Sequence, residues 1–108
     1  MRFFERVFAV TALIPPGKVM TYGQISQVLD NQCSARYVGY AMRAAPKDRG
    51  LPCHRVVNRL GETAPRLFGE GHRARLEAEG AIFKADGRLD LDACRFWPNP
   101  EDVPVSPD

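Results

Sequence analysis

The sequence contains no long hydrophobic run, because none of its apolar stretches approaches the roughly 18 residues that a membrane-spanning helix requires. Near its start, Glu5 and Arg6 stand where a signal peptide would begin its apolar segment. Internal repeats and low-complexity tracts are also missing. These absences argue against export and membrane anchoring, and we expect a cytoplasmic protein that does not bind membranes.

Cysteine is scarce, and the number of cysteines is odd. Cys33, Cys53 and Cys94 are separated by 20 and 41 residues, without any C-x-x-C pair. An odd count in a chain that is not exported argues against a disulfide framework, and the spacing argues against structural zinc. We therefore expect no metal and no soluble cofactor. Packing and thiol chemistry remain as roles for these side chains.

The composition is that of an ordinary globular protein, with 44% hydrophobic and 26% charged residues in a chain of 108. The net charge of +2 is unevenly distributed. Residues 1–59 hold nine Lys or Arg against three Asp or Glu, whereas residues 81–108 hold three against six. This asymmetry is compatible with a polyanionic partner and equally with a scattered, solvated surface.

Two helices are predicted in the first thirty residues. Apolar residues at helical spacing predict a helix over residues 3–13, which ends before two consecutive prolines and a glycine. Thr21 and Gln24 have the spacing of a capping box and predict a helix over residues 22–29.

A third, basic helix follows after a short break. Ser34 is suited to cap it and Pro46 ends it, and its exposed positions include Arg36 and Arg43. Two short helices joined in this way predict either a DNA-binding helix-turn-helix or an ordinary helical hairpin. The pattern alone leaves both interpretations open.

The second half of the sequence is less regular. Residues 71–79 predict a helix with Gly80 in the left-handed position that follows it. Residues 81–83 and 88–91 predict a small hairpin. Four prolines after Phe96 predict that residues 98–108 form a flexible tail.

Cys53 stands in the segment with the clearest chemical potential. Pro52 precedes it, and His54 and Arg55 follow. Cationic and hydrogen-bonding neighbours lower the pKa of a thiol and so favour the reactive thiolate. In an extended segment His54 would point to the opposite face and reach Cys53 through a water. Considered alone, the segment favours a buried, inert cysteine beside a core histidine.

Four motifs occur in an order that points to one family. Residues 14–23 resemble I-P-x-G-x-V-x-x-Y-G, residues 35–42 resemble A-R-x-V-G-x-A-M, residues 52–57 resemble P-C-H-R-V, and Glu79 with Gly80 matches a final E-G. Together they resemble the DNA-binding domain of the O6-alkylguanine-DNA alkyltransferases, the methylated-DNA–protein-cysteine methyltransferases. The resemblance implies a mainly α fold with short β strands, a winged helix-turn-helix. It covers most of the predicted domain, which we place at residues 1–97.

The resemblance also implies a chemistry. Cys53 would attack the alkyl carbon of a guanine flipped out of the duplex and keep the alkyl group, in a single-turnover methyltransferase reaction. His54 would deprotonate Cys53 through a water, and Glu79 would orient His54. Tyr22 would hydrogen-bond the flipped base or help to rotate its phosphate.

The basic helix would then be the recognition helix. By resemblance, Arg36 would enter the base stack and fill the gap that the flipped base leaves. Ala35 and Gly39 are small and would let this helix approach the minor groove closely. The expected partner is double-stranded DNA containing O6-alkylguanine, bound by a monomer.

Two departures from the family pattern keep a second function open. Ala45 stands where the transferases carry asparagine, and residues 63–71 lack their Y-x-G-G lid over the guanine. Residues 76–80 and 96–98 resemble the alkyltransferase-like proteins, which bind and flip alkylated guanine and recruit nucleotide excision repair proteins without transferring the alkyl group. Those proteins typically carry tryptophan or alanine in place of Cys53. A helix-turn-helix module without lesion specificity is the remaining alternative.

Overall fold

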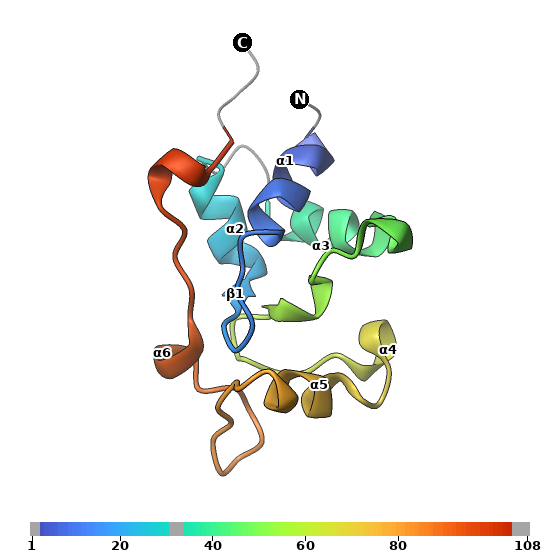
Figure 1. Cartoon of the computed structure of the whole chain (residues 1–108), viewed down its shortest axis with the longest axis vertical. Helices are drawn as coiled ribbons and strands as arrows, with labels where there is room; N and C mark the ends of the chain where they lie inside the picture. The colour runs from blue at the N-terminus through green and yellow to red at the C-terminus, as the bar shows by residue number, and fades with distance from the viewer. Residues whose placement is uncertain (1–2, 31–33, 105–108) are drawn as a thin grey trace.

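The computed structural model describes residues 3–30 and 34–104, which form six α-helices, two short strands and three 3-10 turns (Figure 1). The predicted class, mainly helical with short strands, is confirmed. The α-helices are α1 (Phe3–Thr11), α2 (Tyr22–Val28), α3 (Ala35–Ala44), α4 (Pro65–Phe68), α5 (His72–Ala78) and α6 (Leu91–Cys94). The strands are β1 (Met20–Thr21) and β2 (Val56–Val57), and the 3-10 turns are η1 (Lys47–Arg49), η2 (Cys53–Arg55) and η3 (Pro100–Asp102).

The helix-turn-helix consists of α2 and α3, which pack against each other. The capping box that opens α2 is present: the Gln24 N–H donates to Thr21 Oγ1 at 3.0 Å, and the Thr21 N–H donates to Gln24 Oε1 at 3.2 Å. Ser34 Oγ accepts from the Tyr37 N–H at 3.3 Å and caps α3. These caps satisfy backbone donors that a helix start would otherwise leave unpaired, which fixes both starts at the predicted residues.

A parallel pair of strands holds the site together. Met20 pairs with Val56 and Thr21 with Val57. The sequence predicted an extended segment through Cys53, but η2 replaces it and ends directly at β2. Because the strands are parallel and in register, η2 ends at one end of the pair and α2 begins at the other, only two residues further along.

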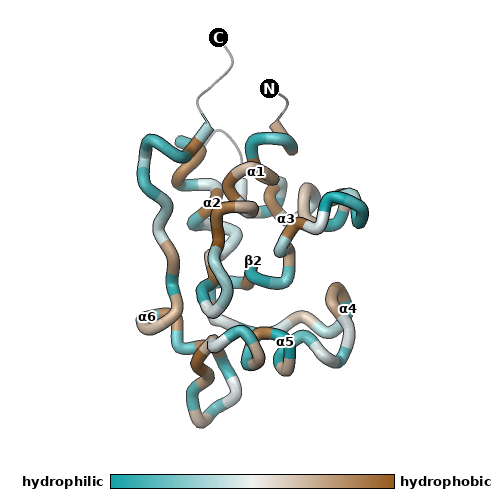
Figure 2. The backbone as a smooth tube through the Cα atoms, viewed as in Figure 1, coloured by the Kyte–Doolittle hydropathy of each residue, from teal (hydrophilic) through white to brown (hydrophobic). Residues whose placement is uncertain are grey.

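Two hydrophobic clusters lie on either side of this sheet. The first joins α1, α2 and α3, whose hydrophobic stretches lie side by side (Figure 2). The second contains Val19, Val57, Leu76, Leu89 and Cys94 and holds α5 and the segment after it. Each fully buried Leu or Val contributes about 1.5–3 kcal/mol, so both clusters stabilise the fold, and they position the polar residues between them.

The remaining predicted elements are shorter than expected. The first helix, predicted over residues 3–13, ends at Thr11. The Thr11 hydroxyl donates to the Val7 carbonyl at 2.8 Å. The predicted hairpin is reduced to a single antiparallel bridge between Phe83 and Leu89, with Gly87 at φ +90° in the turn.

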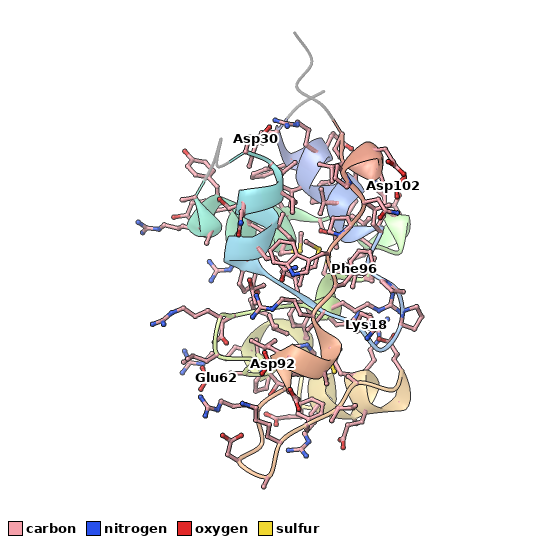
Figure 3. The ribbon with its side chains drawn as sticks, turned by 90° about the vertical axis from the view of Figure 1, so that its left-hand side faces the viewer. Lys18, Asp30, Glu62, Asp92, Phe96 and Asp102 are labelled. Atoms are coloured by element: carbon pink, nitrogen blue, oxygen red, sulfur yellow. The ribbon has the colours of Figure 1, made fainter. Side chains whose placement is uncertain are left out.

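The last described residues run along the first cluster (Figure 3). Gln24 donates a side-chain hydrogen bond to the Phe96 carbonyl, and Val103 packs against the same cluster. Arg6 Nη2 donates to the Pro104 carbonyl at 3.4 Å. The boundary at residue 97 and the flexibility of the tail stay predictions, and residues 105–108 lie outside the described residues. Within residues 3–30 and 34–104 none of the helices is long and apolar enough to cross a membrane.

Candidate functional site

A partly buried ionic cluster joins η2 to the end of α5. Glu79 accepts hydrogen bonds from His54 Nε2 at 3.0 and 2.9 Å. Arg55 binds the same carboxylate in a fork, Nε at 3.0 Å and Nη2 at 2.8 Å. The third Arg55 contact is the Ile14 carbonyl, at 2.8 Å from Nη1. Two consecutive residues of η2 are thus fixed by one carboxylate.

The protonation states of this cluster follow from its contacts. The Arg55 hydrogen bonds, with those of His54, lower the pKa of Glu79 to about 2. Burial lowers the pKa of His54, although Glu79 acts in the opposite direction. At neutral pH the site therefore holds a carboxylate and a neutral imidazole. Since a carboxylate only accepts hydrogen bonds, Nε2 carries the ring hydrogen and Nδ1 keeps a free lone pair, the state of a general base.

A second buried histidine, His72 at the start of α5, supports this arrangement. His72 Nδ1 accepts from the Ala64 N–H at 2.9 Å, so its Nε2 carries the hydrogen and donates to the His54 carbonyl at 2.8 Å. The ring of Phe68 packs against it, with centroids 4.6 Å apart. His72 is not predicted from the sequence, because a lone histidine in a predicted helix carries no signal of its partners.

Cys53 lies half-buried at the start of η2. Burial raises the pKa of its thiol, and a backbone hydrogen bond opposes this shift only in part. The sequence suggested a cationic neighbourhood that lowers the pKa, and that expectation is wrong in direction. Arg55 is turned to Glu79 and Ile14, which leaves Cys53 as a thiol that needs a base to ionise.

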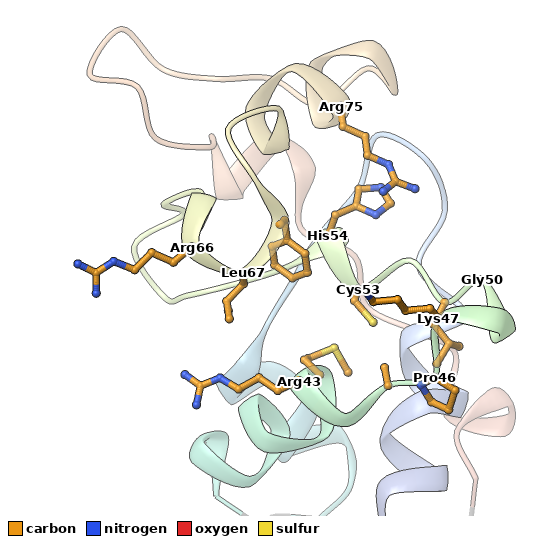
Figure 4. Close-up of a pocket in the computed structure, with 13 residues that line it drawn as sticks. Arg43, Pro46, Lys47, Gly50, Cys53, His54, Arg66, Leu67 and Arg75 are labelled. Carbon is orange, nitrogen blue, oxygen red and sulfur yellow. The ribbon is translucent and has the colours of Figure 1, made fainter.

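Cys53 and His54 line a cavity of about 560 Å3, here called the Cys53 cavity (Figure 4). It opens between the end of α3, the 45–51 segment, η2, α4 and α5. Its volume is in the range of small-molecule pockets. Ala45 contributes only its methyl group to the lining. The helix α4 lies within residues 63–71, the segment that lacks the Y-x-G-G lid of the family.

An adjoining space of about 600 Å3, here called the Tyr22 hollow, lies along the outer face of α3. Its lining includes the four residues predicted to bind DNA and to flip the base: Tyr22, Ala35, Arg36 and Gly39. A Cβ added at Gly39 would meet nothing within 4 Å, so this face of α3 is open. Burial raises the pKa of Tyr22, while Arg43 lowers it and Cys53 raises it further.

The two spaces share Arg43 and Leu67 in their linings. Leu67, on α4, is 44% exposed and stands between the spaces rather than in a core. Glu79 lines neither space and contacts His54 from behind. The structure therefore brings six of the seven predicted site residues to two adjoining spaces and holds the seventh against one of them.

The fold and the site define a helix-turn-helix domain that carries a cysteine and a histidine in a cavity beside its second helix, with a glutamate bound to the histidine from outside the cavity. Residues 2–81 match the family of the 6-O-methylguanine DNA methyltransferase, DNA binding domain, and the chain belongs to this family.

Relatives of two kinds are similar to the chain. It is 38% identical over 97 residues to the "DNA base-flipping protein" of Escherichia coli (strain K12). The aligned region covers 87% of this chain and 74% of that protein. The alkyltransferase-like protein of Schizosaccharomyces pombe, solved with damaged DNA containing O6-carboxymethylguanine, superposes with a TM-score of 0.74 at 32% identity, over 91% of this chain and 100% of that one. The O6-methylguanine methyltransferase of Mycobacterium tuberculosis gives 0.61 at 32% identity, over 80% of this chain and 53% of that one.

Proposed function

We propose that this protein binds O6-alkylguanine in duplex DNA, flips the altered base out of the stack and accepts its alkyl group on Cys53. The adjacency of the Tyr22 hollow and the Cys53 cavity carries this proposal. A base that leaves the duplex beside α3 passes Arg43 and Leu67 and reaches Cys53 without crossing a core. The names of the base-flipping relatives support the same function.

Flipping is the energetically costly step of this process, at a few kcal/mol for a paired base. Arg36 is exposed on α3, with its guanidinium 5.9 Å from the Tyr40 ring centroid. In our proposal it enters the stack and occupies the space that the base leaves, while Ala35 and Gly39 allow the close approach of α3 to the minor groove. Tyr22 then contacts the flipped nucleotide at the entrance to the Cys53 cavity.

Transfer of the alkyl group requires a thiolate. His54 Nδ1 takes the proton of Cys53 through a water, and Glu79 stabilises the imidazolium that forms. The sulfur forms a bond to the alkyl carbon as the bond from that carbon to O6 breaks. The electron pair remains on the base, which takes up the proton from the His54 imidazolium through the water and is restored to guanine. Cys53 keeps the alkyl group as a thioether.

The alternative function is a lesion sensor that binds and flips the base but does not react. Two features favour this alternative. Burial raises the pKa of the Cys53 thiol, and Ala45 offers no side-chain hydrogen bond in the Cys53 cavity. Such a sensor would need a partner, and nucleotide excision repair proteins are the partner that the family resemblance suggests.

Arg36→Ala is expected to reduce the preference for an O6-methylguanine duplex over an unmodified duplex by about tenfold, since a lost wedge costs about 1.4 kcal/mol of flipping energy. Lys84→Ala removes the same charge from an exposed residue outside both spaces and should change the preference less than twofold. Fluorescence anisotropy with both duplexes measures the ratio. Equal losses from the two substitutions would refute the wedge.

Tyr22→Phe removes one hydroxyl from a half-buried ring that packs against the first cluster. We expect the lesion preference to fall about three- to tenfold, the worth of one hydrogen bond, with no change in thermal stability. The two measurements are binding to the same pair of duplexes and a thermal melt. A Tyr22 that only packs would leave the binding ratio where it was.

A further inference from the structure

The charged side chains that line the Cys53 cavity all carry positive charge. Four of its side chains are Arg43, Lys47, Arg66 and Arg75, and Asp and Glu are absent from the residues that line it. Among the described residues, none of these four forms an ion pair. Unpaired like charges around one cavity repel one another, so an anion inside it relieves that repulsion.

Neighbouring cations on the same elements are paired. Arg73, two residues before Arg75 on α5, binds Glu77 at 3.3 Å and lies 4.5 Å from the Phe83 ring centroid. Arg49, two residues after Lys47, binds Glu5 at 2.9 Å. The neighbours of Arg75 and Lys47 on α5 and η1 thus have acidic partners, whereas these two residues of the Cys53 cavity have none.

The four cations divide into two pairs (Figure 4). Arg43 and Arg66 extend together to one side of the cavity, and Arg43 also lines the Tyr22 hollow. Lys47 and Arg75 stand on the opposite side, where Lys47 points toward Cys53 and Arg75 lies beside His54. Arg75 also acts on His54 electrostatically, in the direction that lowers the pKa of that ring. The inner pair, Lys47 and Arg75, is therefore the pair nearest to a group that reaches Cys53.

We propose that Lys47 and Arg75 form an anion subsite for the O6 substituent, so that the cavity favours guanines whose O6 group carries a negative charge. This inference rests on the proposed function, which brings the alkyl carbon to Cys53. A carboxylate on that substituent lies beyond the reacting carbon, in the space that the two cations flank. A neutral substituent of equal size gains no such contact.

The test compares two duplexes that differ only in charge. One carries O6-carboxymethylguanine and the other O6-carbamoylmethylguanine, its neutral isostere, so that phosphate contacts cancel in the ratio. The Cys53→Ser chain is used to keep both ligands intact during titration. We expect the carboxylate to bind about fivefold more tightly, the upper range for a pair of partly exposed charges.

Two variants assign the effect to the inner cations. Lys47→Gln and Arg75→Gln should each lower the fivefold affinity ratio of the two duplexes toward one. Arg73→Gln, a matched change on α5, should leave this ratio unchanged. Equal affinity for the two duplexes in the parent chain overturns the proposal. So does an Arg75→Gln loss that is the same for both duplexes, since that result assigns Arg75 to the DNA backbone.

The proposed function is tested separately by the ratio of O6-methylguanine to guanine duplex binding. If that ratio is one, lesion recognition itself fails. If lesions are preferred but the carboxylate and its isostere bind equally, only the anion subsite fails.

Discussion

Incubation with a duplex containing O6-methylguanine is expected to add one methylene to the intact mass of the protein, and peptide mapping should place it on Cys53. Cys53 lies in the wall of a cavity that a flipped base can reach, next to a neutral His54 held by Glu79. Cys53→Ser should abolish the mass change while binding persists, because the serine hydroxyl is a far weaker nucleophile at neutral pH.

The reaction should be slow and dependent on pH. Because burial raises the pKa of Cys53, only a small fraction of the protein holds a thiolate unless His54 takes the proton. As the pH falls through the lowered pKa of His54, the base becomes protonated and transfer should stop. Misalignment by about 1 Å, for example at Ala45, costs on the order of a hundredfold in rate, so the incubation must be long.

Two other cysteines serve as controls. Cys94 is 1% exposed, and its Sγ accepts the Ile82 N–H at 3.1 Å, so Cys94→Ser should leave the mass change intact. Cys33, which lies outside the described residues, should behave in the same way. If saturating lesion DNA leaves the mass unchanged after prolonged incubation, the proposed transfer is wrong and the lesion sensor remains.

The helix-turn-helix could be predicted because its signals are local. The capping box of Thr21 with Gln24 and the cap at Ser34 act within three residues, and both are present as expected. A helix start is decided mainly by such short-range hydrogen bonds, which the order of residues already contains.

The site could be predicted only in part, because its geometry depends on contacts between distant residues. The pairing of β1 with β2 joins two-residue strands that no periodicity reveals. The fork of Arg55 on Glu79 spans 24 residues and engages the guanidinium away from Cys53, whose pKa burial raises. The two hydrogen bonds of His72 likewise become visible only when α5 lies against η2.

Glu79→Gln is expected to lower the free energy of unfolding at pH 7 by about 3 kcal/mol, the usual cost of removing one partner from a buried ion pair. The Arg55 side chain is only 14% exposed, and without the carboxylate its charge has no compensating partner there. Glu77→Gln is the matched control, two residues earlier on α5. Its carboxylate is 50% exposed and pairs with Arg73 at the surface, so its loss should cost at most about 0.5 kcal/mol.

The same carboxylate should make stability depend on pH. Its pKa falls from 4.5 to about 2 on folding, so its contribution is complete above about pH 5 and is lost as the pH falls toward 2. Full linkage gives about 3 kcal/mol, and because the side chain is 18% exposed we expect about 2 kcal/mol after solvent screening. Urea unfolding at pH 7 and pH 3 measures about half of this loss in the wild-type chain, because the folded carboxylate is still mostly ionised at pH 3. The Glu79→Gln chain lacks the titrating group, so the difference between the two proteins should shrink by about 1 kcal/mol at pH 3. A difference that is the same at both pH values would mean that the ionised carboxylate does not hold Arg55 and His54 in place.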